Sequence, residues 1–350
     1  MMDLIFKPRL AAPALFGAAL AASLLAGAAP AAAEDCKPHA IDLGEGKSVQ
    51  GGCAPLKIAF LSAATNNLYL QAGIKGAKDA AEKYGVTVDV FDANWDPATQ
   101  FNQAQNAITG GQYNAILAEM NDGNQACAIL SKDAMEKNVL VAVANGPLCG
   151  KASEEGEALW TSGTLTFIGG SQGRAAFRDW ILDIAKTNPG KQKVAVITGP
   201  DLNANTINTD LAIEDVKKQF PEFEIVGVAR TDYSVLQGNQ KILPLLQANP
   251  DLTILVSNYS DMTRGAIAAV KQAGMGGKLK IYDYGGNGWA FEALKADQIT
   301  ATRMLTPYTE MYKGVEALAK AWKGEDVPRF TPLETAEVTK DNLATSKSEF

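Results

Sequence analysis

The chain has 350 residues, of which 47% are hydrophobic, and a formal net charge of −7 at pH 7. An acidic chain without a cluster of Lys and Arg argues against nucleic-acid binding, which depends on cations that neutralise phosphates. The length exceeds what one hydrophobic core usually organises, so two domains of ordinary size are expected.

Residues 1–33 have the pattern of a secretory signal peptide. Lys7 and Arg9 precede an apolar, alanine-rich run, and the segment finishes in three alanines at 31–33. The run is shorter than the roughly 18 to 20 residues of a membrane-spanning helix. We therefore predict cleavage before Glu34, export to the periplasm, and a mature protein without a lipid anchor, because no Cys directly follows the cleavage site.

Four cysteines lie in the first half of the predicted mature chain: Cys36, Cys53, Cys127 and Cys149. In an oxidising compartment an even number favours disulfides. Of the three possible pairings, the local one, Cys36 with Cys53 and Cys127 with Cys149, closes the shortest loops. A zinc site is the alternative, but the chain has no CxxC pair and a single histidine, so we expect no metal.

That histidine, His39, also limits the catalytic mechanisms open to the chain. It lies close to the predicted new N-terminus, whereas Ser-His-Asp and Cys-His mechanisms need a histidine in the folded core. The sequence contains no GxSxG, GxxxxGK[ST] or GxGxxG motif. We predict a protein that is not an enzyme and requires no cofactor.

From residue 56 onwards, short β-branched runs alternate with helical patterns, which predicts parallel sheets flanked by helices. The predicted strands are residues 57–62, 87–92, 115–120, 139–144, 193–198, 224–229, 253–257, 280–284 and 300–305. Helices are clearest over residues 69–84, where Gly85 follows, and over residues 308–322. Asp261 is predicted to cap a helix that Gly274 ends.

The series breaks between residues 146 and 167, where the chain is rich in Gly, Ser and charged residues. We place a crossover between two domains at residues 160–164. Each half then begins with a strand, an Asn-rich loop and a helix, at residues 61–77 and 197–216. Ligands bind where parallel strands end and helices begin, so the two loops are expected to converge on one cleft.

Three segments resemble the type I periplasmic sugar-binding proteins, the ribose-binding group in particular, in their order and spacing: residues 57–117, SDMTRGAIAAVKQAG at 260–274 and KIYDYGGN at 280–287. The resemblance implies an α/β fold of two doubly wound parallel-sheet lobes joined by three hinge crossovers. Lobe 1 would comprise residues 56–160 and 306–326, and lobe 2 residues 161–305 and 327–350, after a leader at 34–55.

The same resemblance implies a function. It predicts a monomeric substrate-binding component of an ABC-type importer, which captures a sugar or sugar-like molecule between its lobes and delivers it to a membrane permease. A receptor subunit that serves a sensor kinase or chemoreceptor is the alternative. A sugar-responsive repressor shares the fold but needs an N-terminal helix-turn-helix, where this chain has an export signal.

Ligand-binding residues are predicted from the resemblance and from their positions at strand ends. They are Asn66, Asn67, Tyr69 and Asn145 in the first lobe, and Asn205, Thr206, Tyr233, Tyr259, Ser260, Asp283, Asn287 and Trp289 in the second. Amides hydrogen-bond to polar ligands and aromatic rings stack on them. For Asn66 and Asn67, turn formation or helix capping is the alternative. Trp95 and Trp160 are expected to pack or to lie at the hinge.

The chain departs from the ribose group at the charged positions of the site. Asn145 and Gly146 stand where that group has Asp-Arg, Ile207 stands in the region of its second arginine, and Gly285 stands at its sugar-binding Asp. Planar Arg and Asp side chains read paired hydroxyl groups. Their loss argues against a simple pentose and for a less hydroxylated or differently charged ligand.

Overall fold

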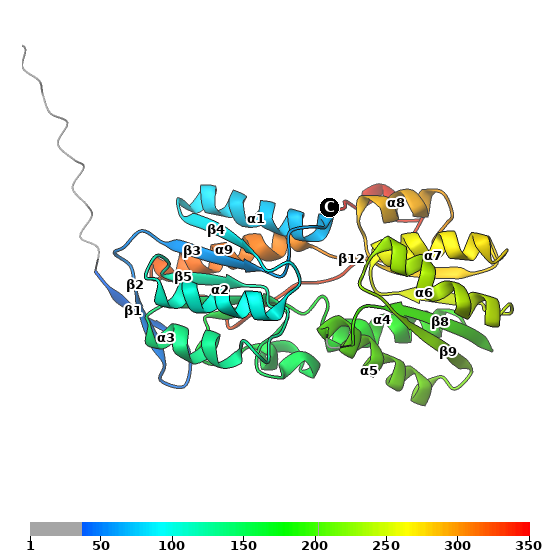
Figure 1. The fold of residues 1–350 in the computed structure, drawn as a ribbon, viewed down its shortest axis with the longest axis horizontal. Helices are drawn as coiled ribbons and strands as arrows, with labels where there is room; N and C mark the ends of the chain where they lie inside the picture. Colours follow the sequence, from blue (N-terminus) through cyan, green and yellow to red (C-terminus); the bar gives the residue numbers. More distant parts are fainter. Residues whose placement is uncertain (1–36, 202) are drawn as a thin grey trace, which may run out of the picture. The chain divides into compact units, whose positions relative to one another are not determined.

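The computed structural model describes residues 37–201 and 203–350. Cys36 and the predicted signal peptide with its cleavage site lie outside these residues. The described residues form two six-stranded sheets and one two-stranded hairpin (Figure 1). The predicted fold class, two parallel-sheet α/β lobes, is confirmed.

The lobe 1 sheet has the strand order β13-β7-β6-β5-β3-β4, and all of its neighbouring strands are parallel. Its strands are β3 (Lys57–Ser62), β4 (Thr87–Asp92), β5 (Ala115–Ala118), β6 (Leu140–Asn145), β7 (Thr166–Gly169) and β13 (Phe330–Pro332). One face carries α1 (Leu68–Tyr84) and α9 (Pro307–Trp322), which pack together. The other carries α2 (Pro97–Thr109), a π-helical turn (Ile129–Asp133) and α3 (Ala134–Glu136) (Figure 1).

The strands of lobe 1 are buried on both faces because helices cover both. In β3, Ile58 and Phe60 pack in the cluster beneath α1 and α9, whereas Ala59 and Leu61 pack in the cluster beneath α2 and α3. Helix α1 begins at the Asn67 cap, whose side chain accepts from the backbone N–H of Leu70. Packing on both faces of the sheet thus holds each strand, and the loop that follows it, in place.

The lobe 2 sheet has the order β14-β12-β11-β10-β8-β9, with β14 the antiparallel edge strand. Its strands are β8 (Gln192–Thr198), β9 (Phe223–Arg230), β10 (Ile254–Ser257), β11 (Lys280–Gly285), β12 (Ala301–Met304) and β14 (Glu337–Val338). Its helices are α4 (Arg174–Thr187) and α5 (Ala204–Gln219) on one face, and α6 (Val235–Ala248), α7 (Ser260–Gln272) and α8 (Gly288–Lys295) on the other. Trp180, Phe177 and Tyr284 form an aromatic cluster in the core.

Two of the three crossovers lie later than predicted. The first is at residues 170–173, not 160–164, because β7 pairs with β6 and thereby belongs to lobe 1. The last is at residues 333–336, not 327, because β13 pairs with β7. The middle crossover lies between β12 and α9, at residues 305–306.

The predicted leader, residues 34–55, is part of lobe 1 where it is described. It forms a hairpin of β1 (His39–Asp42) and β2 (Ser48–Gly51). Ile41 and Val49 of this hairpin belong to the hydrophobic cluster beneath α1 and α9. The ring of His39 lies 3.1 Å from the carbonyl oxygen of Ala321, at the end of α9.

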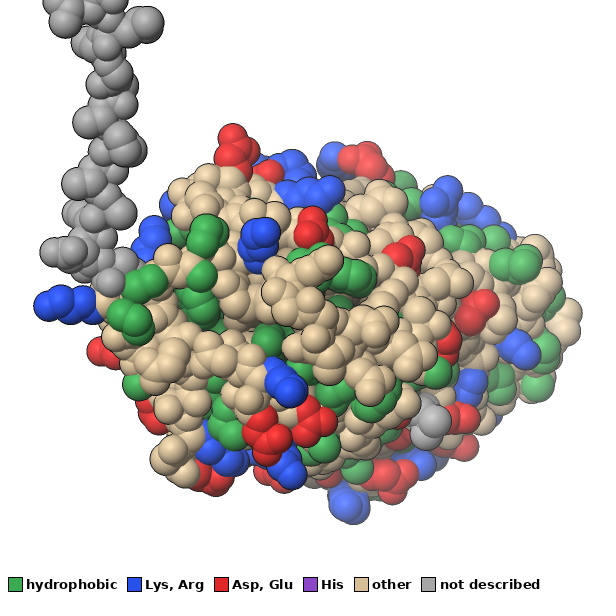
Figure 2. Space-filling model, turned by 60° about the vertical axis from the view of Figure 1, so that its left-hand side comes forward, with side chains coloured by type: hydrophobic (Ala, Val, Ile, Leu, Met, Phe, Trp, Pro, Cys, Tyr) green, Lys and Arg blue, Asp and Glu red, His purple; other side chains and the backbone are tan. Residues whose placement is uncertain are grey.

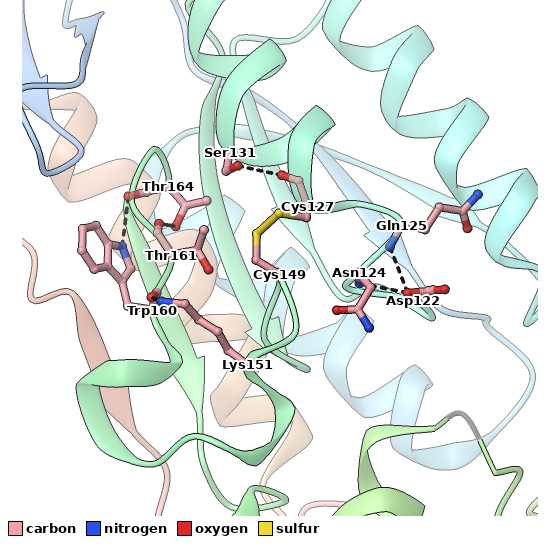
Figure 3. The surroundings of a disulfide bond; sticks show 10 residues. All are labelled: Asp122, Asn124, Gln125, Cys127, Ser131, Cys149, Lys151, Trp160, Thr161 and Thr164. Carbon is pink, nitrogen blue, oxygen red and sulfur yellow. Dashed lines mark hydrogen bonds between the residues drawn. A yellow bond between two sulfur atoms is a disulfide. The ribbon is translucent and has the colours of Figure 1, made fainter.

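A disulfide joins Cys127 and Cys149, the loops that follow β5 and β6 (Figure 3). The same two loops contain Asp122 and Lys151, which line a cleft described below. The bond therefore holds two cleft loops of lobe 1 together. Cys53 is also disulfide-bonded, and its predicted partner lies outside the described residues.

One helix start differs from the sequence prediction. Helix α7 begins at Ser260 with Tyr259 at the cap position, so Asp261 lies in the first turn instead of capping the helix. The helix ends at Gln272, two residues before Gly274, whose positive φ continues the chain in the left-handed region.

The described surface carries charges of both signs. On the face in Figure 2, Lys and Arg side chains are interspersed with Asp and Glu and form no large basic patch. Over residues 37–201 and 203–350, no helix combines the length and the hydropathy that a membrane span requires.

Candidate ligand-binding cleft

A cleft lies between the strand ends of the two lobes. One part, named the deep part after its buried residues Tyr69, Glu119 and Tyr259, has fourteen lining residues: from lobe 1 Ala63, Asn67, Tyr69, Leu70, Trp95, Glu119, Met120, Asn121 and Asn145, from the first crossover Gln172, and from lobe 2 Asn203, Asn205, Tyr233 and Tyr259. Two further openings share Asn121 and Asn203 with this part, so the space is continuous. Ligand groups can therefore be contacted from both lobes at once.

Side-chain amides dominate the polar surface of the deep part. They are Asn67, Asn121, Asn145, Gln172, Asn203 and Asn205, and each amide group offers both donors and an acceptor. Four aromatic residues, Tyr69, Trp95, Tyr233 and Tyr259, supply apolar walls. A concave surface of this kind suits a small polar molecule whose hydroxyl groups both donate and accept.

The hydroxyl of Tyr69 is the centre of a hydrogen-bond network that links the lobes. It donates to Glu310 Oε2 over 2.8 Å and accepts from Asn145 Nδ2 over 2.7 Å and from Gln172 Nε2 over 3.0 Å. Gln172 in turn accepts from Asn205 Nδ2 over 2.6 Å. The network thus runs from α9 and α1 of lobe 1 through the first crossover to α5 of lobe 2.

Glu310 is buried behind this network, at 1% exposure. Its Oε1 accepts from the backbone N–H of Asn145 over 3.0 Å. Burial raises the pKa of Glu310 to about 7, and the hydrogen bonds from Tyr69 and Asn145 act in the opposite direction. Burial and the charge of Glu310 also raise the pKa of Tyr69, so its hydroxyl stays protonated.

Glu119 directly follows β5 and lines the deep part of the cleft, with 5% of its surface exposed. Burial and the nearby charge of Glu310 raise its pKa to about 8. The hydroxyl of Ser62 is 3.4 Å from Glu119 Oε2. The backbone N–H of Ala63 also hydrogen-bonds to the carboxyl group, and no Lys, Arg or His in the described part of the chain pairs with it.

Tyr233 and Tyr259 form the aromatic wall of the cleft in lobe 2. Their rings are nearly perpendicular, with ring centroids 5.8 Å apart. Tyr233 donates to Asn203 Oδ1 over 2.8 Å, and its ring lies so close to Gly199 that a Cβ there would overlap it. Tyr259 is 8% exposed, and its buried hydroxyl has no hydrogen-bond partner among the described residues. That hydroxyl is available to a ligand.

The structure brings six of the twelve predicted ligand residues into the deep part of the cleft: Asn67, Tyr69, Asn145, Asn205, Tyr233 and Tyr259. Asn66 lines the outer opening, where its Oδ1 accepts from Trp95 Nε1 over 3.1 Å. The side chain of Asn67 also caps α1 through Leu70. Asn67 therefore both caps α1 and lines the cleft.

Five predicted residues lie outside the lining: the side chains of four are hydrogen-bonded within lobe 2, and the fifth, Trp289, packs there. Thr206 bonds Thr198 in the core, one helical position away from Asn205. Ser260 donates to the buried carboxylate of Asp283 over 2.8 Å. The side chain of Asn287 caps α8 at Ala290, and Trp289 packs against the lobe 2 core. The five residues, which were predicted to bind ligand, instead have core or capping contacts in lobe 2.

Sequence reasoning missed Glu119, Asn121, Gln172 and Asn203, and assigned Trp95 to packing, although it is 43% exposed and lines the cleft. Glu119 and Asn121 follow β5, so the strand-end rule could have found them had the strand not been drawn through residue 120. Gln172 lies in the first crossover, which was placed too early.

The described residues contain no group of three His, Cys, Asp or Glu side chains arranged to hold a metal ion. The charged residues that line the cleft and its openings are Glu119, Asp122, Asp232, Asp261 and Lys151. Most polar groups of the lining are amides and hydroxyls, which suit hydrogen bonding to a ligand.

Fold and cleft together define a two-lobed small-molecule-binding protein. The periplasmic binding protein domain family matches residues 58–326, and the chain belongs to this family. The resemblance found in the sequence is thereby confirmed, and members of the family are binding proteins.

Individual relatives agree with this assignment. The chain is 28% identical over 274 residues to a candidate rhizopine-binding protein of Rhizobium meliloti, covering 77% of this chain and 85% of that protein. It is 23% identical over 289 residues to the ribose import binding protein RbsB of Escherichia coli, covering 81% and 90%. A Caulobacter myo-inositol binding protein bound to myo-inositol superposes with a TM-score of 0.72 at 21% identity, covering 84% and 98%.

Proposed function

We propose that this protein is the periplasmic substrate-binding component of an ABC-type importer, which captures one sugar-like molecule between its lobes and delivers it to a membrane permease. The observation that carries the proposal is the amide-rich cleft, which takes polar side chains from both lobes and from the crossover between them. The relatives that bind or import ribose and the structural neighbour that binds myo-inositol support a polyhydroxylated ligand.

The Tyr69 network supports a mechanism of capture by lobe closure. Gln172, in the first crossover, contacts Tyr69 of lobe 1 and Asn205 of lobe 2 at the same time. A ligand that hydrogen-bonds to the free sides of these amides stabilises the arrangement in which both lobes are engaged. A permease can then distinguish the loaded from the empty form by the relative position of the lobes.

Export rests on the signal peptide pattern of residues 1–33. Expression of the full chain in a Gram-negative host should release protein into the periplasm with Glu34 at its N-terminus. N-terminal sequencing of that fraction measures this directly. A cytoplasmic protein that retains Met1 would contradict the proposed location. The mature protein should elute as a monomer in size-exclusion chromatography.

Binding is tested by thermal shift of the mature protein against sugars, polyols, cyclitols and amino sugars, followed by calorimetry of each hit. A ligand that binds only the folded state raises the melting temperature by mass action. Asn205→Ala and Tyr233→Ala should each weaken the hit at least tenfold, whereas Asn106→Ala, at an exposed position of α2, should leave it unchanged. Full affinity in both cleft variants would show that the ligand binds elsewhere.

A further inference from the structure

We propose that the ligand carries a protonated amine on a polyhydroxylated body, and that Glu119 forms the ion pair with this ammonium group. The inference rests on the proposed function and specifies its ligand class. Its basis is a carboxyl group that lines the cleft and has no cation beside it among the described residues.

The carboxyl group of Glu119 has hydrogen-bond partners but no cation beside it: the backbone N–H of Ala63 donates to it, and the hydroxyl of Ser62 is in reach. Ser62 is the side-chain donor in reach, at 3.4 Å from Oε2, yet its hydroxyl lies 2.6 Å from the carbonyl oxygen of Ala64. A serine hydroxyl has one proton to donate, and the shorter, better bond takes it. No Lys, Arg or His in the described part of the chain pairs with Glu119 or Glu310.

A buried carboxyl group without a counter-ion is costly to ionise, so its presence in a binding cleft needs a reason. An Asn or Gln at this position would offer hydrogen bonds to ligand hydroxyls without that cost, as the six amides that line the same cleft can. Burial and Glu310 raise the pKa of Glu119 to about 8, and Tyr69, on the facing helix α1, is protonated and offers no charge. An ammonium group from the ligand removes the penalty by completing an ion pair.

The other charges of the cleft favour a cation too. Asp122, Asp232 and Asp261 line the openings, and Lys151 is the one basic residue in the described lining. The ammonium of Lys151 is engaged by the carbonyl oxygen of Trp160 (Figure 3). A cleft lined mainly by one sign of charge concentrates ligands of the opposite sign.

A second observation, independent of the carboxylates, points to the same space. The Tyr259 hydroxyl of lobe 2 lines the deep part of the cleft, is buried, and has no partner among the described residues. This hydroxyl and the amides of the lining can hydrogen-bond to further polar groups of the ligand. An aminated sugar or cyclitol supplies both the cation and the hydroxyls, whereas a simple alkylamine supplies only the first.

The experiment uses matched pairs that differ only by an amine in place of a hydroxyl: D-glucosamine with D-glucose, and an inosamine with the corresponding inositol. Calorimetry at pH 7 with wild-type mature protein should show at least one amine bound roughly ten- to a hundredfold tighter than its hydroxyl partner. Glu119→Gln, which keeps the size and hydrogen-bonding capacity of the side chain, should abolish that preference. Glu136→Gln, the same substitution at an exposed position of α3 outside the cleft lining, should change the amine affinity less than threefold.

A second readout separates the ion pair from a structural role of Glu119. Glu119 binds a proton in most unliganded molecules at pH 7 and must lose it to pair with an ammonium, so the wild type should release a proton on binding the amine. Calorimetry in phosphate and in Tris buffers, which differ in ionisation enthalpy, measures this release. Glu119→Gln should show none.

The outcomes distinguish the inference from the proposed function. If the neutral sugar or inositol binds as tightly as its amine, or if Glu119→Gln keeps the preference, the amine inference is wrong and the sugar-binding function stands. If no member of either pair and no other sugar, polyol or amino sugar binds the wild type, the proposed function fails with it. A Glu119→Gln variant that melts at or above the wild-type temperature shows that its lost affinity is not a loss of fold.

Discussion

Glu119 and Asp283 are both buried carboxylates at the carboxyl ends of strands, one in each lobe, but their surroundings differ. Asp283, in β11, accepts from Ser260 Oγ over 2.8 Å, from Thr302 Oγ1 over 2.5 Å and from Thr263 Oγ1. Glu119, after β5, has the hydroxyl of Ser62 at 3.4 Å and the backbone N–H of Ala63 as partners, and it lines the cleft. The hydrogen bonds of Asp283 all come from its own lobe, and its side chain does not line the cleft, whereas Glu119, with one hydroxyl and one backbone N–H beside it, does.

The difference shows that position at a strand end is insufficient to make a ligand-binding residue. A carboxylate that three neighbouring hydroxyls satisfy acts as a structural link between β11, α7 and β12. A carboxylate that has fewer partners and lines a cleft has capacity for a ligand. The four predictions that follow test this distinction, beginning with the largest expected effect.

Asp283→Ala should destabilise the protein by about 3–5 kcal/mol, because it removes a buried group and leaves the three hydroxyls without their acceptor. Chemical denaturation of the unliganded protein measures the change. The fraction that remains folded should bind ligand with wild-type affinity, since Asp283 does not line the cleft. A stable variant with weakened binding would instead make Asp283 a ligand residue.

The unliganded protein should lose stability as the pH rises from about 5 to about 8. The folded pKa of Glu119, about 8, and of Glu310, about 7, lie above the ordinary value of 4.5, so the folded state binds more protons in this window. This contribution to stability is complete below pH 4.5 and is lost as the pH passes the folded pKa values. Glu119→Gln should reduce the decline by about 2–4 kcal/mol. Chemical denaturation at several pH values measures the decline. If Glu119→Gln has the same pH dependence of stability as the wild type, the raised pKa assigned to Glu119 is wrong.

Tyr69→Phe should cost about 1–2 kcal/mol of stability, because Glu310, Asn145 and Gln172 all lose a hydrogen-bond partner. Ligand affinity should fall about tenfold, since Gln172 is then no longer held between the lobes. The matched control is Tyr113→Phe, whose hydroxyl donates to exposed Asp89 over 3.0 Å. If the two variants change the affinity equally, the hydrogen-bond network of Tyr69 does not contribute to ligand binding.

Tyr259→Phe should change the stability of the unliganded protein least, by less than about 0.5 kcal/mol, because the hydroxyl it removes has no hydrogen-bond partner in the described part of the chain. Tyr284→Phe should cost more, since that hydroxyl donates to the carbonyl oxygen of Ser171. If Tyr259→Phe weakens ligand binding without destabilising the protein, the hydroxyl contacts the ligand. If it destabilises as much as Tyr284→Phe, the hydroxyl is satisfied within the protein.

Much of the fold could be predicted from the sequence, because β-branched runs and helical periodicity are local properties. The crossovers could not be placed as well. Strand β7 is four residues long and follows a Gly-rich loop, and β13 is three residues long. Such short strands owe their pairing to the sheet beside them, which a single sequence does not display.

The candidate site could be predicted in its loops but not in its individual side chains. Asn205 lines the cleft and Thr206 faces the core, because neighbouring positions on a helix point in different directions. Asp283 looked like a ligand residue because the three hydroxyls that satisfy it come from distant segments. Whether a polar residue is satisfied depends on those contacts.

The most direct test of the account is a crystal structure of the mature protein with the tightest-binding amine from the matched pairs. The account predicts the ligand between the lobes, its nitrogen about 3 Å from a carboxylate oxygen of Glu119, and the hydroxyl of Tyr259 bonded to the ligand. Asp283 should keep its three hydroxyl partners and make no contact with the ligand. A ligand whose nitrogen lies away from Glu119, or that contacts Asp283 instead, would contradict the account.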